Sequence, residues 1–497
     1  MPRLIQRIHN HRGDLIVGLL KIITYLGLSA AFFLLMSINN WQLRNPSRTL
    51  GITLITWVAM SGAMTLVYGG YEIGRKKSKP IITNMTLGVL ITDMVTYLQL
   101  QIMNVNANNR THLDIFGEDF PYLLLTMVIQ ALFLVAIVRF GNHSFFSIYP
   151  PKQCLLILGQ LDEQEQITDK LNHFRLQWRV RKAVTWDCPE LRNEIEASEV
   201  VFITDVPQHE AMRILQICYD LHRDVLCKAK LQDIMLSSAQ QVVIDDAPFL
   251  EMDYHKMTLW QRIVKRFTDI FLSALILLLL SPLMAIIALL IHYEDGGKVI
   301  FRQSRMTIGG RNFTIYKFRT MKEHFEGLPQ SSATENDPRI TRVGRVLRRT
   351  RLDELPQFWN ILRGDMTLVG PRPEMLDNVE KYKSQMPTFV YREKVKAGLT
   401  GYAQIEGKYN TVPEDKLMLD LMYIESFSIW LDIKLLMRTA TVIFKRDSTQ
   451  GFTPVQGTPV DNDASPREES PCAGAVPVPQ PVVEAHQSGD RPILPGE

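Results

Sequence analysis

The chain has 497 residues, of which 46% are hydrophobic and 22% charged, and its formal net charge is +3. These totals exclude a collagen, a coiled-coil rod and a wholly disordered chain, and the length accommodates three or four domains of about 100–200 residues each. The five cysteines are scattered, with no CxxC pair and no matching histidine spacing. They indicate neither a disulfide framework nor a zinc site and favour thiols kept reduced in a cytoplasm. The first residues lack a short apolar core followed by a small-residue cleavage site, so we expect no removable signal peptide.

The first 150 residues are depleted in charge, with 12 basic and 6 acidic side chains. They contain four apolar runs, each close to the ~20 residues that a helix needs to cross a ~30 Å hydrocarbon core. The runs lie near Leu15–Ile38, Leu50–Tyr71, Ile81–Met103 and Phe120–Phe140. Helices of a water-soluble bundle would each show a charged face, and these runs show none. The sequence therefore predicts a four-helix transmembrane domain over residues 1–149.

Charged residues between the runs predict which way the helices point. Three arginines precede the first run and four cations lie at 75–79, whereas the segment 104–119 carries three acids against one arginine. Arg44 and Arg48 in the first connection disagree. The positive-inside bias still favours both ends of the bundle in the cytoplasm. Asp93, in the middle of the third run, is either a functional intramembrane carboxyl or a buried polar contact between helices.

Short apolar runs alternate with helix-like stretches in residues 150–250, which indicates a parallel sheet with crossover helices. The predicted strands are Cys154–Leu158, Val200–Ile203 and Val242–Ile244, and the predicted helices are Gln164–Phe174 and His209–His222. No GxGxxG motif follows the first strand, so the pyrophosphate-binding loop of a dinucleotide site is missing. We predict a degenerate nucleotide-binding-like (Rossmann-like) domain used in regulation or assembly, with ligand binding as the alternative.

A fifth apolar run, Phe267–Ile291, follows three cations and contains Ser281-Pro282 near its middle. Proline removes a backbone donor and its ring clashes with the carbonyl of Leu278, so the helix must kink or break. A break lets the helix return to the face it entered from, provided that the Ser281 hydroxyl or packed protein covers the exposed backbone. A kinked helix that spans the membrane is the alternative, and it would place the residues that follow outside the cytoplasm.

Residues 298–351 contain 13 basic and 4 acidic side chains, a strongly cationic segment in a nearly neutral chain. Such a strip serves nucleic acid, anionic lipid or phosphorylated substrates. Aromatic residues for base stacking are sparse and the strip follows a membrane insertion, so we expect phosphates at the membrane surface and no nucleic acid. The cations lie on a predicted strand and on one face of a predicted helix: Lys317, Arg319, Arg345, Arg348, Arg349 and Arg351. The guanidinium fork of arginine suits phosphate oxygens.

Two adjacent carboxylates, Asp353 and Glu354, follow this cationic segment. Nearby cations should lower both pKa values and keep both groups ionised at neutral pH. An ionised aspartate can bind Mg²⁺ together with substrate phosphates, or attack a phosphorus atom to form an aspartyl phosphate. Acids at a helix N-terminus that complement the helix dipole are the other interpretation.

Two loops follow the carboxylates. In Gly364–Glu374, Pro371 and Pro373 fix the backbone around Arg372, and Gly398–Gln404 is punctuated by glycines. We interpret both as substrate-binding loops, with tight turns between elements as the alternative.

The end of the chain contains two further segments. Ser428–Phe444 has an amphipathic pattern, which is typical of a helix in the lipid headgroup layer or of one packed on a core. Residues 447–497 are rich in Pro, Ser, Gly and Glu and are predicted to form a disordered tail.

Together these residues resemble the catalytic domain of the bacterial sugar transferases, the monotopic phosphoglycosyl transferases. The motifs that carry the resemblance are Lys317–Met321, Leu352–Gln357, Gly364–Glu374 and Gly398–Gln404, in that order. The full layout is similar to the large polyprenyl-phosphate hexose-1-phosphate transferases. The resemblance implies a membrane α-helical bundle, an α/β Rossmann-like domain and a mixed α/β catalytic domain at 251–446. It also implies a re-entrant membrane helix at 263–292 that breaks at Ser281-Pro282.

The resemblance further implies a reaction at the cytoplasmic face of the bacterial inner membrane. Asp353 would attack the β-phosphate of a UDP-hexose, release UMP and retain the sugar-phosphate covalently. Undecaprenyl phosphate would then take the sugar-phosphate and start a surface glycan such as an exopolysaccharide, capsule or O-antigen. Glu354 would position Mg²⁺ or activate the acceptor, so both carboxylates are predicted metal ligands. The sequence does not show whether glucose or galactose is transferred, and it leaves the oligomeric state open, a homo-oligomer included.

We predict that substrate-contacting residues surround the two carboxylates: Lys317, Arg319, Arg348, Arg351, Pro371, Arg372, Pro373, Glu374, Gln404 and Lys408. Lys408 departs from the Asn-Gly-Arg of many family members, and lysine lacks the bidentate fork of arginine. Two other functions compete with the transferase. One is a membrane-anchored assembly or regulatory protein of polysaccharide export with an inactive transferase domain. The other is a nicotinamide oxidoreductase, which the missing glycine fingerprint disfavours.

Overall fold

A computed structural model describes the chain at residues 2–70, 72–74, 76–107, 113–160, 162, 164–252, 257–322, 337, 339–407 and 411–443. The chain forms two compact units. Residues 142–228 belong to one unit, and the described residues before 142 and after 228 belong to the other. The predicted disordered tail at 447–497 and the predicted substrate contact Lys408 lie outside the described residues.

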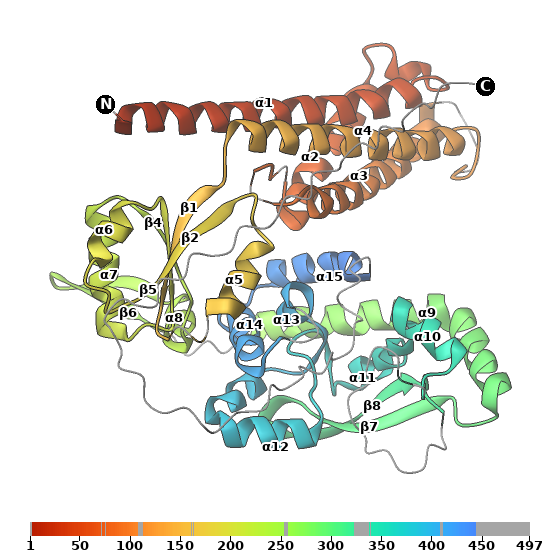
Figure 1. The fold of residues 1–497 in the computed structure, drawn as a ribbon. Coiled ribbons are helices and arrows are strands. Elements are labelled where there is room, and N and C mark those ends of the chain that lie inside the picture. The colour runs from red at the N-terminus through yellow and green to blue at the C-terminus, as the bar shows by residue number, and fades with distance from the viewer. Residues whose placement is uncertain are drawn as a thin grey trace, which may run out of the picture. The chain divides into compact units, whose positions relative to one another are not determined.

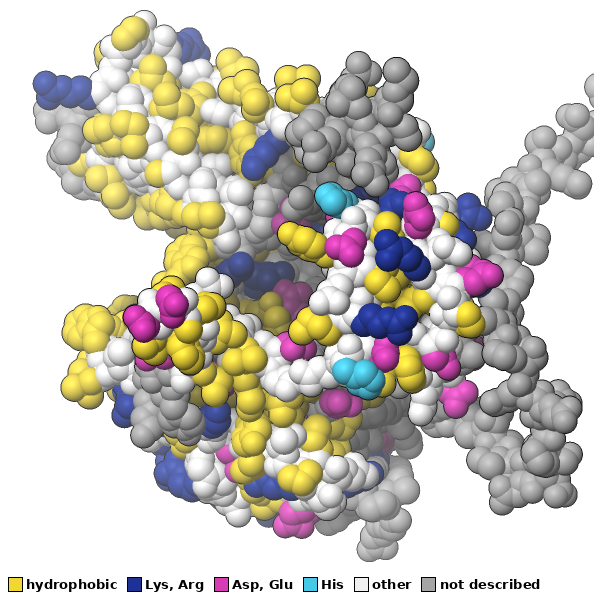
Figure 2. Space-filling view, turned by 90° about the vertical axis from the view of Figure 1, so that its left-hand side faces the viewer, with side chains coloured by type: hydrophobic (Ala, Val, Ile, Leu, Met, Phe, Trp, Pro, Cys, Tyr) yellow, Lys and Arg dark blue, Asp and Glu magenta, His cyan; other side chains and the backbone are white. Residues whose placement is uncertain are grey.

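Four long helices occupy the four apolar runs of the N-terminal part (Figure 1). They are α1 (Pro2–Met36), α2 (Arg48–Tyr68), α3 (Ser78–Ala107) and α4 (Phe120–Ile148). Each contains a stretch long and apolar enough to cross a membrane, and at most 44% of any such stretch is buried within the protein. Hydrophobic side chains cover much of these helices on the face seen in Figure 2. So much apolar surface is unfavourable in water, and the helices are suited to lipid.

Polar side chains inside this bundle join one helix to another. Asp93 is fully buried and accepts a hydrogen bond from Trp57 Nε1 at 3.1 Å, which joins α3 to α2. Gln130 Nε2 donates to the carbonyl of Leu28 at 3.0 Å, which joins α4 to α1. Hydrogen bonds between helices contribute to helix association in lipid. The structure therefore favours the interpretation of Asp93 as an interhelical contact.

Residues 142–228 contain a fully parallel four-stranded sheet in the order β2-β1-β3-β4. Its strands are β1 (Lys152–Leu158), β2 (Trp178–Thr185), β3 (Val200–Thr204) and β4 (Asp224–Cys227), and its helices are α5 (Gln164–Asn172), α6 (Leu191–Glu196) and α7 (Gln208–Asp220). In β1 the run Cys154–Leu158 is completely buried, as expected for a central strand that is covered on both faces. The predicted parallel sheet with crossover helices is confirmed.

The turn after β1 packs closely on the turn after β3. Gly159 N donates to the carbonyl of Thr204 at 3.0 Å, and a Cβ on Gly159 would lie 2.3 Å from the carbonyl oxygen of Asp205. In doubly wound sheets, ligands bind between strands at this carboxyl edge, where the strand order reverses. Here a carbonyl of the neighbouring turn approaches Gly159 too closely for a Cβ, so packing explains the glycine.

The predicted strand Val242–Ile244 exists, but its expected place in the parallel sheet is wrong. It lies in β5 (Gln240–Ile244), which pairs antiparallel with β6 (Ala247–Glu251). Asp245 and Asp246 separate the two strands, and Asp245 has a φ of 60°. A two-residue loop that begins with a left-handed residue is the geometry of a tight hairpin. The turn residues therefore decide the pairing of this strand.

The fifth apolar run forms α9 (Leu259–Asp295), which continues through Pro282 and changes direction along its length (Figure 1). It too is long and apolar enough to cross a membrane. Pro282 has no N–H to donate to the carbonyl of Leu278. The hydroxyl of Ser281 donates to that carbonyl instead, at 2.8 Å, so the backbone acceptor left by the proline is satisfied within the helix.

The residues after α9 form a mixed α/β part with one hydrophobic core. Its strands are an antiparallel pair, β7 (Ile300–Met306) and β8 (Asn312–Phe318), and a parallel pair, β9 (Thr367–Val369) and β10 (Gly398–Thr400). Its helices and 3₁₀ turns are α10 (Arg342–Thr350), η4 (Leu352–Glu354), α11 (Gln357–Arg363), α12 (Leu376–Gln385), η5 (Pro387–Lys394), α13 (Tyr402–Glu406), α14 (Pro413–Glu425) and α15 (Ile429–Ile443). The short helix α8 (Leu231–Leu236) adds Ile234 to the same core, which includes Ile315, Ile361 and Phe389.

Polar residues in the first turns of α9 hold this part to the membrane helix. Arg266 Nη1 and Nη2 donate to the carbonyls of Ile361 and Leu362, each at 2.7 Å, at the end of α11. The buried Asp269 carboxylate accepts from Leu368 N at 2.9 Å on β9. Hydrogen bonds to charged groups are about twice as strong as neutral ones, so α9, α11 and β9 form one connected body.

We expect Gly344→Ala in the first turn of α10 to destabilise the protein. A Cβ at this position would lie 2.2 Å from the carbonyl oxygen of Thr320. Because the Cβ is rigidly attached to the backbone of α10 and the carbonyl belongs to the backbone of Thr320, relief requires α10 to move away from the segment after β8. The free energy of unfolding should fall by about 1–3 kcal/mol, the usual cost of overpacking, which a lower midpoint of thermal unfolding in detergent would show.

Gly62→Ala in α2 is the matched control, since a Cβ there meets no atom of the described residues within 4 Å. Its midpoint should stay unchanged or rise slightly, because alanine is the better helix former. A Gly344→Ala protein that unfolds at the wild-type temperature would contradict the packing described.

Candidate active site

Asp353 and Glu354 lie in a tight reversal between α10 and α11. Thr341 Oγ1 accepts a hydrogen bond from Gly344 N at 2.9 Å and caps the start of α10. The helix ends at Arg351, whose φ of 57° is left-handed, a conformation that costs a non-glycine residue about 1–3 kcal/mol. This reversal leads the chain into η4, which carries the two carboxylates.

Glu354 contacts cations from three separate segments of the chain. Its Oε1 lies 3.4 Å from Lys317 Nζ on β8 and 3.3 Å from Arg372 Nη2 in the Gly364–Glu374 loop. Its Oε2 lies 4.0 Å from Arg351 Nη1. The Glu354 side chain is 15% exposed, so water screens these contacts only weakly. The structure thus brings together four residues that the sequence analysis places in the site.

Asp353 differs from its neighbour in its contacts. Among the described residues, no cation lies within the 4.0 Å ion-pair distance of its carboxylate. Lys317, Arg348 and Arg372 act on it electrostatically from farther away. Arg348 is held by a hydrogen bond from its Nε to Thr320 Oγ1 at 2.9 Å. One carboxylate of the pair therefore binds the cations, and the other keeps its oxygen atoms available.

The two carboxylates have opposite pKa shifts. Burial by itself would raise the pKa of Glu354, but the positive charges of Lys317, Arg372 and Arg351 lower it to about 2. Burial, and then repulsion from Glu354, raise the pKa of Asp353 to about 6. The expectation that the cations lower both pKa values is therefore wrong for Asp353, because burial raises its pKa and the cations pair with Glu354, whose negative charge raises it further. Asp353 is still mostly ionised at pH 7.

The two glycine-containing loops pack against each other, backbone to backbone. Gly370 N donates to the carbonyl of Thr400 and Gly398 N to that of Pro371, each at 2.8 Å. A Cβ on Gly398 would lie 2.1 Å from Gly370 N, and one on Gly401 would lie 2.2 Å from Gly370 O. The close approach of β9 and β10 requires these glycines. This pairing fixes the base of the loop that carries the Pro-Arg-Pro motif.

Two predicted substrate contacts make contacts within the protein instead. The Glu374 carboxylate forms an ion pair with Lys416 on α14 and lies 3.9 Å from Arg392 Nη1. Gln404 Nε2 donates to the carbonyl of Leu399 at 3.3 Å, within its own loop. Both contacts stabilise the loops, and a direct role in substrate binding stays a prediction for each residue.

The remaining predicted cations differ in exposure. Arg319 is buried just after β8 and makes no ion pair with the two carboxylates among the described residues. Arg345 and Arg349 are exposed, whereas Arg348 and Arg351 are half-buried near the carboxylates. The predicted guanidinium face of α10 is thus divided between the site and solvent, because the helix ends and the chain reverses at Arg351.

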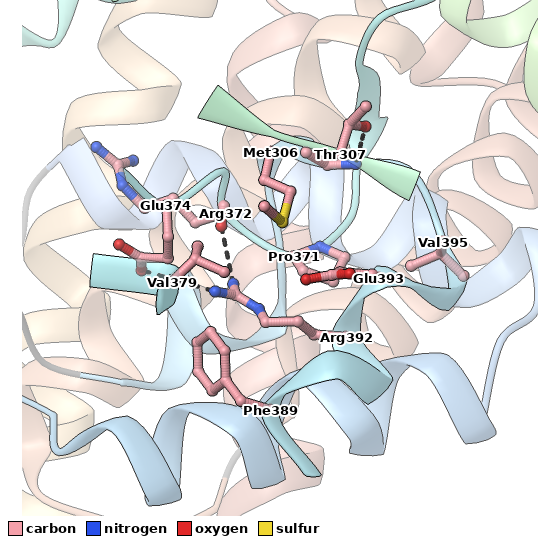
Figure 3. A pocket seen from close by; sticks show the side chains of 11 residues that line it. Met306, Thr307, Pro371, Arg372, Glu374, Val379, Phe389, Arg392, Glu393 and Val395 are labelled. Atoms are coloured by element: carbon pink, nitrogen blue, oxygen red, sulfur yellow. Dashed lines mark hydrogen bonds and ion pairs between the residues drawn. The ribbon is translucent and has the colours of Figure 1, made fainter. Parts of the chain in front are cut away.

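Arg392 and Asp420 are site residues that the sequence analysis does not identify. Arg392 Nη2 donates to the carbonyl of Arg372 at 2.8 Å and lies 2.8 Å from Asp420 Oδ2. Arg392 borders a small hollow beside the Pro-Arg-Pro loop, which Pro371 and Glu374 also line (Figure 3). The two residues lie on different elements, η5 and α14. Because the two residues are far apart in sequence and lie on different elements, the spacing of residues along the sequence does not predict their pairing.

The two carboxylates also form the candidate Mg²⁺ site. In the described part of the chain, no cluster of three or more His, Cys, Asp or Glu side chains is arranged to hold a metal. Mg²⁺ usually takes one or two carboxylates together with waters and substrate phosphates. Asp353 and Glu354 supply that number, and Asp353 has the more available oxygen atoms, so the donor set fits this ion.

Comparison with known proteins connects this site to a family. The family model described as bacterial sugar transferase matches residues 260–446. An Escherichia coli K12 protein named UDP-glucose:undecaprenyl-phosphate glucose-1-phosphate transferase is 45% identical over 183 residues. An Aeromonas hydrophila protein named UDP-N-acetylgalactosamine-undecaprenyl-phosphate N-acetylgalactosaminephosphotransferase is 42% identical over 183 residues. Each match covers 36% of this chain, and 39% and 43% of the two relatives respectively.

A third relative covers more of its own length. It is a Caulobacter vibrioides protein named UDP-glucose:undecaprenyl-phosphate glucose-1-phosphate transferase, 40% identical over 189 residues, which are 37% of this chain and 71% of the relative. This chain thus spans about two fifths of the first two relatives and most of the third. The segment matched by the family model begins in α9 and includes the two carboxylates and both glycine-containing loops. The chain therefore belongs to the bacterial sugar transferase family.

Proposed function

We propose that the protein transfers a hexose-1-phosphate from a UDP-sugar to undecaprenyl phosphate and releases UMP. The arrangement of the two carboxylates carries the proposal. Asp353 is mostly ionised and lacks an ion-pair partner in the described part of the chain, and it adjoins Glu354 with its three cations. Such an arrangement suits attack on a phosphorus atom that is flanked by anionic oxygens. Relatives that share this domain are named for sugar-phosphate transfer to undecaprenyl phosphate.

In the first step an Asp353 carboxylate oxygen attacks the β-phosphorus of the UDP-sugar. An oxygen–phosphorus bond forms, and the bond from the β-phosphorus to the bridging oxygen breaks. The electron pair of that bond stays on the oxygen, which leaves as part of UMP. The sugar-phosphate remains on Asp353, so that the bulky lipid needs to enter only after the nucleotide has left.

In the second step a phosphate oxygen of undecaprenyl phosphate attacks the same phosphorus. The bond to Asp353 breaks, the carboxylate is regenerated, and the product is an undecaprenyl diphosphate sugar. Glu354 has a pKa lowered to about 2, which makes it a poor base. Its electrostatic environment therefore supports a role in positioning cations over a role in activating the acceptor.

Positive charge around the two carboxylates would stabilise the phosphoryl group as it is transferred. Lys317, Arg372 and Arg351 contact Glu354, and Arg348 lies near Asp353. Fixed cations in a site with little water stabilise developing charge more strongly than solvent does. Mg²⁺ held by the two carboxylates and the substrate phosphates would neutralise further negative charge.

We also place the reaction at the cytoplasmic face of the bacterial inner membrane. UDP-sugars are soluble in water and undecaprenyl phosphate is a membrane lipid, so the site must lie at an interface between them. The proline in α9, with its acceptor satisfied by Ser281, supports a re-entrant helix that keeps both ends on one side. On α15, Trp430 and Ile433 are exposed, which suits contact with lipid headgroups.

Asp353→Asn should abolish release of UMP from UDP-sugars and the retention of labelled sugar-phosphate on the protein before lipid is added. The amide cannot act as the nucleophile, so the rate should fall at least about 1,000-fold. UDP-glucose, UDP-galactose and UDP-N-acetylhexosamines are the substrates to screen. Asp377→Asn, at an exposed aspartate on α12, should behave as wild type. Normal turnover by Asp353→Asn would disprove the covalent mechanism, and a wild-type protein inactive with every sugar would favour the assembly or regulatory alternative.

Glu354→Gln should shift the pH dependence of the first step. On the acidic side, the rate of UMP release should fall at a lower pH than in wild type. The pKa of Asp353 is raised to about 6 by burial and by the charge of Glu354, so in wild type the rate of UMP release should fall as the pH drops through about 6. The substitution removes the repelling charge and leaves the cations, which lowers the pKa of Asp353. Single-turnover UMP release, measured against pH, tests this shift even if the absolute rate falls. An acidic limb that stays in place or moves upward would contradict it.

A further inference from the structure

A buried cluster of charges lies behind the Pro-Arg-Pro loop, and the proposed reaction does not use it directly. Arg392 is 6% exposed and Asp420 is 2% exposed, and they form an ion pair of 2.8 Å between η5 and α14. The Arg392 guanidinium also lies 4.8 Å from the ring centre of Phe389. Burying an ion pair costs several kcal/mol of desolvation per ion, and hydrophobic residues of similar size are often as stable. Stability alone therefore does not explain why an ion pair is buried here.

The cluster is bonded to the backbone of the residue that reaches the active site. Arg392 Nη2 donates to the carbonyl of Arg372 at 2.8 Å. In Figure 3 this carbonyl points to Arg392, while the side chain of Arg372 extends away from it. At its other end, Arg372 Nη2 lies 3.3 Å from Glu354 Oε1. A single residue thus links the buried cluster to the reacting carboxylates.

Because the residues on either side of Arg372 restrict the backbone, a hydrogen bond to the Arg372 carbonyl can fix the orientation of this residue. Pro371 and Pro373 have a fixed φ and no N–H to donate. Arg305 Nη1 donates to the carbonyl of Pro373 at 3.2 Å, which holds the following peptide unit. With these peptide planes held, the direction of the Cα–Cβ bond of Arg372 is set. The flexible side chain then begins from a defined position.

We propose that Arg392 is a positioning residue, which orients Arg372 so that its guanidinium stays on Glu354 and faces the phosphates of the substrate. Asp420 neutralises Arg392 and holds it against the loop. This inference rests on the proposed function. The buried ion pair then contributes to more than the stability of the fold. By orienting Arg372, it also affects the rate of phosphoryl transfer.

The test is a double-mutant cycle on the first half of the reaction. Single-turnover formation of the labelled protein adduct is measured for Arg372→Gln, for Arg392→Gln and for the double variant. Each single substitution should slow adduct formation by about 10- to 100-fold, as is usual when a supporting residue is lost. The double variant should be no slower than Arg372→Gln alone, because Arg392 acts through Arg372. Losses that multiply would overturn the inference.

Rescue by a conservative variant separates positioning from a merely structural role. Arg392→Lys keeps the positive charge of Arg392 and should recover part of the rate of adduct formation. If the rate does not recover, Arg392 does not orient Arg372.

Lys394→Gln is the matched control for loss of an ion pair. Lys394 also lies on η5 and pairs with a residue of α14, Glu425, at 3.6 Å. Its substitution should change the rate less than about twofold, as expected for a partly exposed pair. Thermal unfolding identifies any variant that does not fold, and Asp420→Asn then replaces Arg392→Gln in the cycle. Wild-type protein that forms no adduct would contradict the proposed function, whereas an active wild type with multiplying losses would contradict the positioning role alone.

Discussion

The contacts of Glu354 with Lys317, Arg351 and Arg372 determine how the site is built. Without a carboxylate between them, three cations from β8, the end of α10 and the Pro-Arg-Pro loop would repel one another. Without the cations, two adjacent half-buried carboxylates could not both be ionised near neutral pH. In this pairing the Glu354 carboxylate contacts all three cations. Its neighbour, Asp353, keeps a raised pKa and available oxygen atoms, so the two acids have different electrostatic environments although they are adjacent in sequence.

Much of this organisation is visible in the sequence, because it depends on local patterns. Apolar runs of about 20 residues mark the long helices, and the proline in Phe267–Ile291 marks the place where α9 needs an extra donor. The continuous apolar run Cys154–Leu158 predicts a strand buried on both faces. The cationic segment 298–351 predicts a phosphate site, and the structure brings two of its cations, Lys317 and Arg351, together on Glu354.

Other features cannot be seen in local patterns, because they depend on contacts between distant segments. The pKa of Asp353 depends on its burial and on which carboxylate the cations contact, and the fold decides both. Arg392 and Asp420 meet from different elements, with no common spacing. The glycines of the two loops serve the approach of β9 to β10, a packing requirement that looks like a substrate-binding pattern in the sequence. The pairing of β5 depends on the conformation of Asp245, which the alternation of apolar residues does not show.

The attachment of α9 has a mechanical consequence. Arg266 and Asp269 bind the end of α11 and the strand β9 directly, and β9 leads without an intervening element into the residues that carry Arg372. A change in the tilt of α9 would thus be passed through β9 to the loop that carries Arg372. Bilayer thickness and lipid composition influence the tilt of membrane helices. We therefore expect the position of Arg372 relative to Glu354 to respond to the lipid that surrounds α9.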